Sequence, residues 1–190
     1  MLEIVLASAS PRRQELLRQV GVSFRVIPST FDESVATPMA PVDLVEYLAV
    51  SKARDVARHQ PGALVIGADT IVVIDGEILG KPRDRSDAIG MLQRLSGREH
   101  EVHTGLAVVT GERRELVSHE STSVRFRDLT LAQIERYVDS GEPMDKAGAY
   151  GIQERGAAIV SSVQGDYFTV VGLPICRLVQ MLSQFGIEVL

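Results

Sequence analysis

Apolar residues recur along the chain in a pattern that predicts alternating strands and helices. Six short runs have the pattern of strands, and they span residues 4–7, 24–27, 64–74, 101–109, 115–126 and 157–163. Between them, apolar side chains return every three or four residues, which predicts helices at 42–58, 85–96 and 173–185. A further helix begins at the capping box of Thr130 and Gln133. The chain therefore belongs to the α/β class.

Two short polar sequences interrupt the apolar runs as hairpin turns. They are IDGE at 74–77 and TGER at 110–113, each flanked by strand-like residues. The sheet must therefore contain antiparallel pairs as well as crossover connections, which makes it mixed. The chain has 190 residues, is 45% hydrophobic and contains no internal repeat or linker, so we expect one domain over 1–190.

Charge and cysteine content narrow the class of protein. The formal net charge of -5 argues against general nucleic-acid binding, which needs a basic surface. The sequence shows no signal-peptide pattern and no apolar run long enough to span a membrane, so we expect a cytoplasmic protein without a membrane partner. The single cysteine, Cys176, excludes an internal disulfide, and its apolar setting predicts a buried helical thiol.

The stretch LASASPRRQELLRQVG at 6–21 places positive charge where a helix favours negative charge. Ser10 and Pro11 predict a helix start, and Arg12 and Arg13 fall in its first turn. Each cation there is unfavourable by roughly 0.3 to 1 kcal/mol at an exposed site. A bound phosphate chain would remove the conflict, with the backbone N–H groups, the arginines and the hydroxyls of Ser8 and Ser10 as ligands. Alternatively, both arginines point into solvent or pair with acidic residues.

Two further charges lie among apolar neighbours. Asp69 lies in the apolar run LVIGADTIVVI, where a carboxylate is costly unless it is paired, hydrogen-bonded or metal-bound. The alternative is a strand that breaks at Gly67, with Asp69 capping the bend. Lys52 continues an apolar helix stripe, and the ordinary explanation is that its amine extends to water. Lys81 precedes Pro82, which keeps its backbone extended.

Other segments carry weaker signals. Glu33 lies in a polar loop, and the glycine-rich segment 140–156 contains Gln153 and is suited to close approach of a ligand, although a plain surface loop is the alternative. GEILGKP is too short for a P-loop, and the spacing of HEVH at 100–103 argues against a zinc site. These segments alone do not define a reaction.

Four sequence blocks together resemble the Maf family of nucleoside triphosphate pyrophosphatases, once described as septum formation inhibitors. The blocks are LASASPRR, GADTIVV with ILGKP, GEPMDKAGAYGIQ, and GDYFTVVGLP, in this order from Leu6 to Pro174. The resemblance implies an elongated mixed sheet flanked by helices, with a cleft between two lobes, as in inosine triphosphate pyrophosphatases. It also implies hydrolysis of nucleoside triphosphates to the monophosphate and pyrophosphate with Mg²⁺ or Mn²⁺.

The resemblance assigns roles to individual residues. Asp69 matches the catalytic acid, taken as the proton acceptor that activates water, and Glu33 matches an acidic residue of the site. Asp69 and Glu33 are also the expected metal ligands, and the sequence leaves open whether they hold the metal or take the proton. The positions that handle the triphosphate are Ser8, Arg12, Arg13, Lys52 and Lys81, with Lys81 counted as catalytic. Arg12, Thr70 and Gln153 match the branch that prefers dTTP and UTP. Thr169 departs from the family, which has asparagine there.

The substrate is then a nucleoside triphosphate, and the family implies a homodimer. Two rival functions remain at this point. One is a phosphatase or kinase-like enzyme that uses the same basic site. The other is a nucleotide-sensing regulator of septum formation that binds without turnover.

Overall fold

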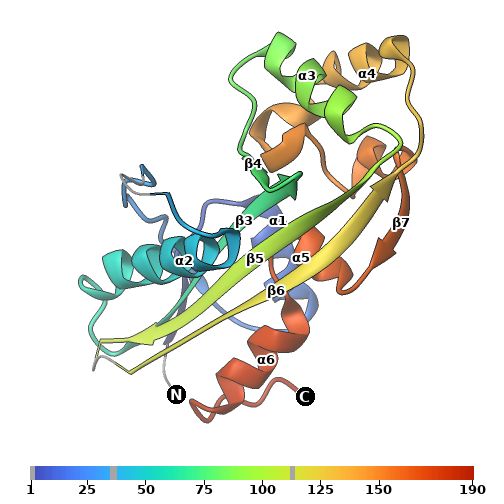
Figure 1. The fold of residues 1–190 in the computed structure, drawn as a ribbon. Coiled ribbons are helices and arrows are strands. Elements are labelled where there is room, and N and C mark those ends of the chain that lie inside the picture. Colours follow the sequence, from blue (N-terminus) through green and yellow to red (C-terminus); the bar gives the residue numbers. More distant parts are fainter. Residues whose placement is uncertain (1–2, 35–37, 112–113) are drawn as a thin grey trace. The chain divides into compact units, whose positions relative to one another are not determined.

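A computed structural model describes residues 3–34, 38–111 and 114–190. The described residues form a seven-stranded sheet with helices beside it (Figure 1), which confirms the predicted α/β class. The strands are β1 (Glu3–Leu6), β2 (Arg25–Val26), β3 (Ala63–Ile74), β4 (Glu77–Leu79), β5 (Glu99–Thr110), β6 (Glu115–Phe126) and β7 (Val160–Gln164). The helices are α1 (Pro11–Gln19), α2 (Pro41–Ala57), α3 (Arg85–Leu95), α4 (Leu131–Val138), α5 (Tyr167–Val171) and α6 (Ile175–Ser183). Three 3₁₀ helices are η1 (Glu142–Asp145), η2 (Ala147–Ala149) and η3 (Glu154–Ala158).

The strand order is β2-β1-β3-β5-β6-β7, with β4 paired to β3. The pairs β1–β2 and β1–β3 are parallel, whereas β3–β4 and β6–β7 are antiparallel, so the sheet is mixed as predicted. The chain divides into two compact units, and the long strands β3, β5 and β6 contribute to both. Organisation as a single domain stays a prediction.

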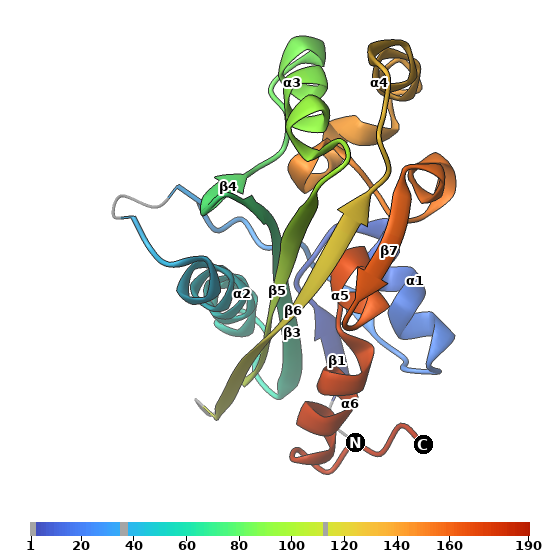
Figure 2. The same cartoon turned by 45° about the vertical axis from the view of Figure 1, so that its right-hand side comes forward.

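Unit 1 comprises Met1–Asp69, Thr104–Glu120 and Gly172–Leu190. Its β1 and β3 run parallel, with Leu6 opposite Ile66, and both strands are buried on the two sides. Helix α2 lies on one face of these strands and α1 on the other (Figure 2). The small side chains of α2 allow the close approach, because Ala49 and Ala53 pack directly on Gly67 of β3. This contact fixes the helix that carries Lys52.

Replacing Gly67 by alanine should lower the free energy of unfolding by about 2 kcal/mol, because an added methyl group overpacks this interface. A Cβ at Gly67 would lie 2.2 Å from the Ala49 carbonyl oxygen, so α2 would have to move. Urea denaturation measures the effect. The matched control is Gly90→Ala in α3, where, beyond the backbone of the helix itself, the added Cβ meets no atom of the described residues within 4 Å and helix propensity favours alanine by about 1 kcal/mol. Equal stability of Gly67→Ala and the wild type would contradict the packing.

Unit 2 comprises Thr70–His103 and Ser121–Val171. Helices α3 and α4 and the 3₁₀ helices gather at one end of this unit (Figure 2), where they pack around a core that includes Leu92, Phe126 and Ile134. The predicted capping box is confirmed, since Thr130 and Gln133 bond each other's backbone at the start of α4. The predicted hairpin at 74–77 is also confirmed, with left-handed residues Asp75 (φ 54°) and Gly76 (φ 76°) joining β3 to β4.

An aromatic cluster in the core of unit 2 encloses a histidine. His100 is 3% exposed and packs edge-on against Phe126 and Tyr150. Its Nε2 lies 2.7 Å from the Tyr150 hydroxyl, whereas its Nδ1 has no hydrogen-bond partner among the described residues. Burial lowers the pKa of His100 to about 4. The imidazole is therefore neutral at pH 7.

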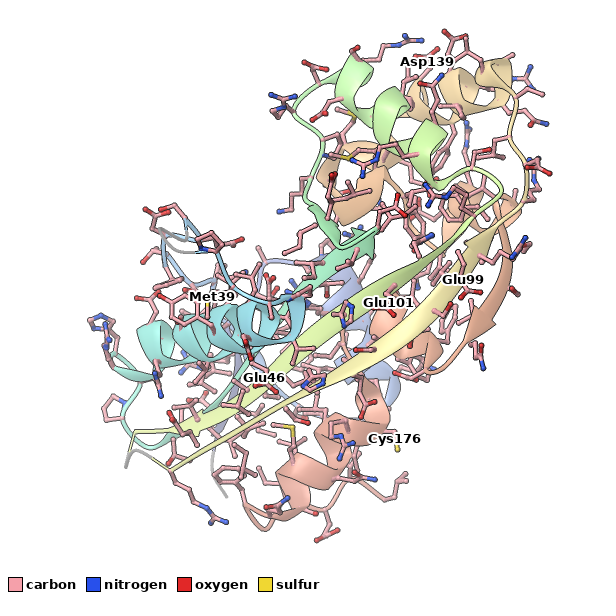
Figure 3. All side chains as sticks on the ribbon, in the orientation of Figure 1. Met39, Glu46, Glu99, Glu101, Asp139 and Cys176 are labelled. Carbon is pink, nitrogen blue, oxygen red and sulfur yellow. The ribbon has the colours of Figure 1, made fainter. Side chains whose placement is uncertain are left out.

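The structure corrects two sequence predictions and leaves one turn outside its description. The last predicted strand, 157–163, instead spans Val160–Gln164, because residues 154–158 form η3. The prediction of a buried thiol is wrong, since Cys176 is exposed on α6 (Figure 3) and the buried positions of that helix, such as Leu178, lie on another side.

Within the TGER turn, residues 112 and 113 lie outside the described residues. In the part that is described, no helix has the length and apolar character needed to cross a membrane.

The departure at Thr169 does not leave a gap in unit 2. Thr169 is completely buried in α5, and its backbone N–H and hydroxyl donate to Asp166 Oδ2 at 2.8 and 2.9 Å. Asp166 therefore caps this short helix through Thr169. Threonine at this position is therefore buried with its hydroxyl hydrogen-bonded.

Candidate functional site

Unit 1 contains a buried ion pair. Asp69 lies on β3 and is 8% exposed, and Lys52 lies on α2 and is 9% exposed. The Lys52 Nζ donates to Asp69 Oδ1 at 2.6 Å. Strand β3 runs without a break through Gly67, so the alternative of a bend capped by Asp69 is wrong. The Lys52 amine does not extend to water either, because it is turned inward onto this carboxylate.

A second carboxylate joins the pair from a loop. Glu33 Oε1 lies 2.8 Å from Lys52 Nζ, and the Glu33 side chain is 57% exposed. One ammonium group therefore bridges a buried carboxylate and a solvent-facing carboxylate. The polar loop predicted around Glu33 is present, and Lys52 brings it against β3.

Helix α2 also holds the loop that carries Glu33. The Asp55 carboxylate accepts hydrogen bonds from the Ser29 hydroxyl at 2.7 Å and from the Thr30 backbone N–H at 2.9 Å. The hydrogen bond from Ser29 is the main reason that the pKa of Asp55 lies below its usual value. Sequence reasoning missed Asp55, although its spacing of three residues from Lys52 places both on neighbouring positions of one helix.

The start of α1 lies beside the same part of β3. Parallel pairing of β1 with β3 ends where Leu6 lies opposite Ile66, so Ser8 follows the carboxyl end of β1, whereas β3 continues to Ile74. Ligand sites of α/β sheets characteristically form at that edge. Ser10 caps α1 by accepting from the Arg13 backbone N–H, as predicted, and Pro11 is the first helical residue.

The guanidinium of Arg13 is turned inward at this helix start. Its Nη1 donates to Ser8 Oγ at 3.1 Å and its Nε donates to the Gly172 carbonyl oxygen at 2.8 Å. The alternative that this arginine points into solvent is therefore wrong, while Arg12 is half-buried. Burial is the main cause that lowers the pKa of Arg13, and the negative charge of Asp69 partly offsets it. Arg12 lowers this pKa further and Glu33 raises it, so these charges share one electrostatic environment.

The structure thus brings together most of the site residues expected from the sequence. In unit 1 these are Ser8, Arg12, Arg13, Glu33, Lys52 and Asp69. The other three lie in unit 2, and their membership of the same site stays a prediction. Lys81 is exposed beside the buried Pro82, Thr70 is half-buried, and Gln153 is half-buried at the start of η3. Thr70 follows Asp69 on β3, so their side chains leave opposite faces of the strand.

The donor set of unit 1 fits a hard divalent cation. Asp69 and Glu33 both direct a carboxylate oxygen at one cationic atom, Lys52 Nζ, so their oxygens already converge on positive charge. Mg²⁺ commonly uses one or two protein carboxylates and completes its shell with water and substrate phosphates. Within the described ranges, no group of three or more His, Cys, Asp or Glu side chains suits a metal. A cation at these two carboxylates would therefore depend on oxygens from the substrate.

Comparison with known proteins places this chain in a family. The dTTP/UTP pyrophosphatase of Symbiobacterium thermophilum is 60% identical over 186 residues, which cover 98% of this chain and 95% of that protein. The dTTP/UTP pyrophosphatase of Moorella thermoacetica is 54% identical over 190 residues, which cover 100% and 98%. The solved Ham1 protein of Staphylococcus aureus is 17% identical with a TM-score of 0.49, over 66% of this chain and 72% of that one. The family model described as Maf-like protein matches residues 3–185, and the chain therefore belongs to the Maf family.

Proposed function

We propose that this protein is a nucleoside triphosphate pyrophosphatase that hydrolyses dTTP and UTP to the monophosphate and pyrophosphate. The observation that carries the proposal is the buried Lys52–Asp69 pair, bridged to Glu33 and sharing its electrostatic environment with Arg13. The names of the similar proteins from Symbiobacterium and Moorella agree with this activity.

The energetics of the ion cluster favour a functional explanation over a structural one. Removing two charges from water costs several kcal/mol per ion, and their mutual attraction seldom returns a net gain in stability. Replacing a buried ion pair by hydrophobic residues of similar volume is often neutral or stabilising. We therefore attribute the retention of these charges to catalysis.

The start of α1 would hold the phosphates. The backbone N–H of Arg12 lies in its first turn, where the helix dipole favours an anion, and Ser8 adds a hydroxyl at the same place. The guanidinium groups of Arg12 and Arg13 match phosphate oxygens in charge and shape. A triphosphate here would remove the conflict between these cations and the helix dipole. Lys81 would add a further positive charge to the leaving pyrophosphate.

Hydrolysis occurs at the α-phosphorus in this proposal. A water oxygen bonds to the α-phosphorus while the bond from that phosphorus to the bridging oxygen breaks, and pyrophosphate leaves with the electron pair. The Asp69 carboxylate either accepts the proton of the water or holds a metal ion. Lys52 fixes the position of this carboxylate at 2.6 Å in both cases. Positioning and charge neutralisation are the main demands of phosphoryl chemistry.

A bound Mg²⁺ or Mn²⁺ would be held by Asp69 and Glu33 and would neutralise charge on the phosphates. Base recognition would fall to Arg12, Thr70 and Gln153. The Gln153 amide can both donate and accept, which matches the carbonyl and N–H edge of thymine or uracil. Polar groups of this kind can reject cytosine far more sharply than an apolar pocket can.

The family resemblance also supports a proposal for the cellular location and the oligomeric state of the enzyme. We place it in the cytoplasm, acting on free nucleotides, and we expect a homodimer. A nucleotide-sensing regulator of septum formation stays the alternative prediction. Such a regulator would bind nucleotides without turnover, so formation of monophosphate and pyrophosphate distinguishes the enzyme from it.

A panel of canonical and modified nucleoside triphosphates tests the function. With Mg²⁺ or Mn²⁺ present, we expect dTTP and UTP to be among the better substrates, with monophosphate and pyrophosphate as the products. Chromatography of the nucleotides and an assay for pyrophosphate measure them. Release of orthophosphate with a nucleoside diphosphate would indicate a phosphatase instead. Poor turnover of both dTTP and UTP would refute the specificity assigned to Arg12, Thr70 and Gln153.

A further inference from the structure

Two side chains of unit 2 hold the loop that carries Gln153, and neither has a role in the proposed function. Tyr137 lies on α4 and is 7% exposed, and Glu142 begins η1. The Tyr137 hydroxyl donates to Glu142 Oε1 at 2.9 Å and accepts from the backbone N–H of Gly151 at 3.1 Å. Gly151, which precedes Gln153 in the loop, is therefore held by this pair of side chains.

The backbone that follows Gln153 in the loop is hydrogen-bonded to the same carboxylate. Glu142 Oε2 accepts from the backbone N–H of Arg155 at 3.1 Å, and Oε1 accepts from that of Gly156 at 3.0 Å. These N–H groups belong to the first turn of η3, where they have no acceptor within the helix. Gln153 occupies the N-cap position of η3 but makes no capping bond with its own side chain. Because Glu142 provides the cap, the Gln153 amide is not used for it.

Close packing and backbone conformation show how tightly the loop is held. A Cβ on Gly156 would lie 1.7 Å from the Gly151 carbonyl oxygen and 2.9 Å from the Tyr137 hydroxyl, so the two ends of the loop touch. Between them, Glu154 has a φ of 52°, in the left-handed region that non-glycine residues seldom adopt. Such a conformation persists only where the surroundings enforce it. The bonds to Glu142 on the next two residues provide that constraint.

We infer that Glu142, together with Tyr137, is a positioning residue that fixes Gln153 and thereby sets discrimination between pyrimidine bases. The inference rests on the proposed function, in which Gln153 contacts the base. Glu142 itself touches no reacting atom. Its carboxylate binds the backbone after Gln153 directly and holds the backbone before it through the Tyr137 hydroxyl. Its loss should therefore loosen the side chain that discriminates while the phosphate-binding residues of unit 1 stay unchanged.

The test compares kcat/KM for dTTP with kcat/KM for dCTP in Glu142→Gln and in Tyr137→Phe. A glutamine keeps the size of Glu142 but replaces one acceptor oxygen by a donor group, which leaves a backbone N–H without its acceptor. We expect the dTTP to dCTP ratio to fall about tenfold in Glu142→Gln. The KM for dTTP should rise while kcat changes by less than about threefold, the signature of lost binding contacts.

Two further variants separate positioning from general destabilisation. Glu135→Gln removes a carboxylate of α4 that takes no part in these bonds and should keep the wild-type ratio. Adding Glu154→Asn to Glu142→Gln should restore part of the ratio, because asparagine adopts left-handed backbone conformations more readily than glutamate. Thermal unfolding checks that each variant is folded, and Tyr137→Phe decides the matter if Glu142→Gln does not fold.

The inference is overturned if Glu142→Gln and Tyr137→Phe both keep the wild-type ratio while Gln153→Ala loses it. Failure of the proposed function gives a different pattern. In that case the wild type makes no pyrophosphate from dTTP, or Gln153→Ala discriminates as the wild type does, and the inference fails with it.

Discussion

Asp69→Asn is expected to lower kcat for dTTP hydrolysis by about a thousandfold, within the range of 10² to 10⁴ that general acid–base groups contribute. Asparagine has nearly the same shape, but it can neither accept the proton of water nor bind a cation as a carboxylate does. The neighbouring Lys52 and Arg13 remain to hold the phosphates. Nucleotide affinity should therefore stay within about tenfold of the wild type. Rapid-quench kinetics measure turnover, and calorimetric titration measures affinity. Because the wild type would hydrolyse dTTP during the titration, its affinity is measured with a non-hydrolysable α,β-imido analogue.

Asp75→Asn is the matched control for this change. Asp75 lies at the end of the same strand, in the turn to β4, where asparagine tolerates the left-handed conformation. Its turnover should equal that of the wild type. Unchanged turnover in Asp69→Asn would remove the catalytic assignment. A loss of turnover that excess Mg²⁺ or Mn²⁺ largely restores would identify Asp69 as a metal ligand and not as the proton acceptor.

The second large effect concerns stability in acid. His100 has a pKa of about 4 in the folded protein, because its burial penalises the charged form, against 6.5 for an ordinary histidine. Between these values the unfolded chain binds a proton that the folded protein does not, so stability falls as the pH is lowered from 6.5 to 4. The full loss from this group is about 3 kcal/mol, and it is absent above pH 6.5. Urea denaturation at a series of pH values measures it.

His100→Gln should flatten this part of the stability profile, because the amide does not titrate, although it lowers stability at every pH by disturbing the aromatic packing. The slope between pH 4 and 6.5 is therefore the quantity to compare. Tyr150→Phe is the matched control, since it removes the hydrogen bond to Nε2 but leaves the imidazole buried. It should keep the wild-type slope. An equal slope in His100→Gln would show that other groups cause the acid sensitivity.

Local signals in the sequence were sufficient for much of the site. The helix start at Pro11 followed from Ser10 and Pro11, whose preferences act within one turn of backbone. Asp69 stands out in the sequence because an unpaired carboxylate is costly in any apolar strand. Lys52 stands out because it continues an apolar stripe of α2. In each case the physical cause lies within a few residues of the chain.

Other features of the site depend on partners that are distant in sequence. Nothing around Glu33 distinguishes it from other acidic loop residues, and only the fold brings it within 2.8 Å of Lys52. Asp55 supports that loop through contacts with Ser29 and Thr30, which the sequence does not pair with it. The exposure of Cys176 was predicted wrongly, because an apolar neighbourhood does not tell which side of α6 faces the core.

The sequence by itself determined the α/β class, the mixed sheet, the start of α1 and the identity of the buried charges, because backbone propensities and the cost of burying a charge are local properties. Tertiary structure alone decided which charges meet. It paired Lys52 with both Asp69 and Glu33, turned Arg13 inward onto Ser8, and gave η3 its cap from Glu142. These contacts form only when the chain packs, since electrostatic and hydrogen-bond energies depend on distances that separation in sequence does not fix.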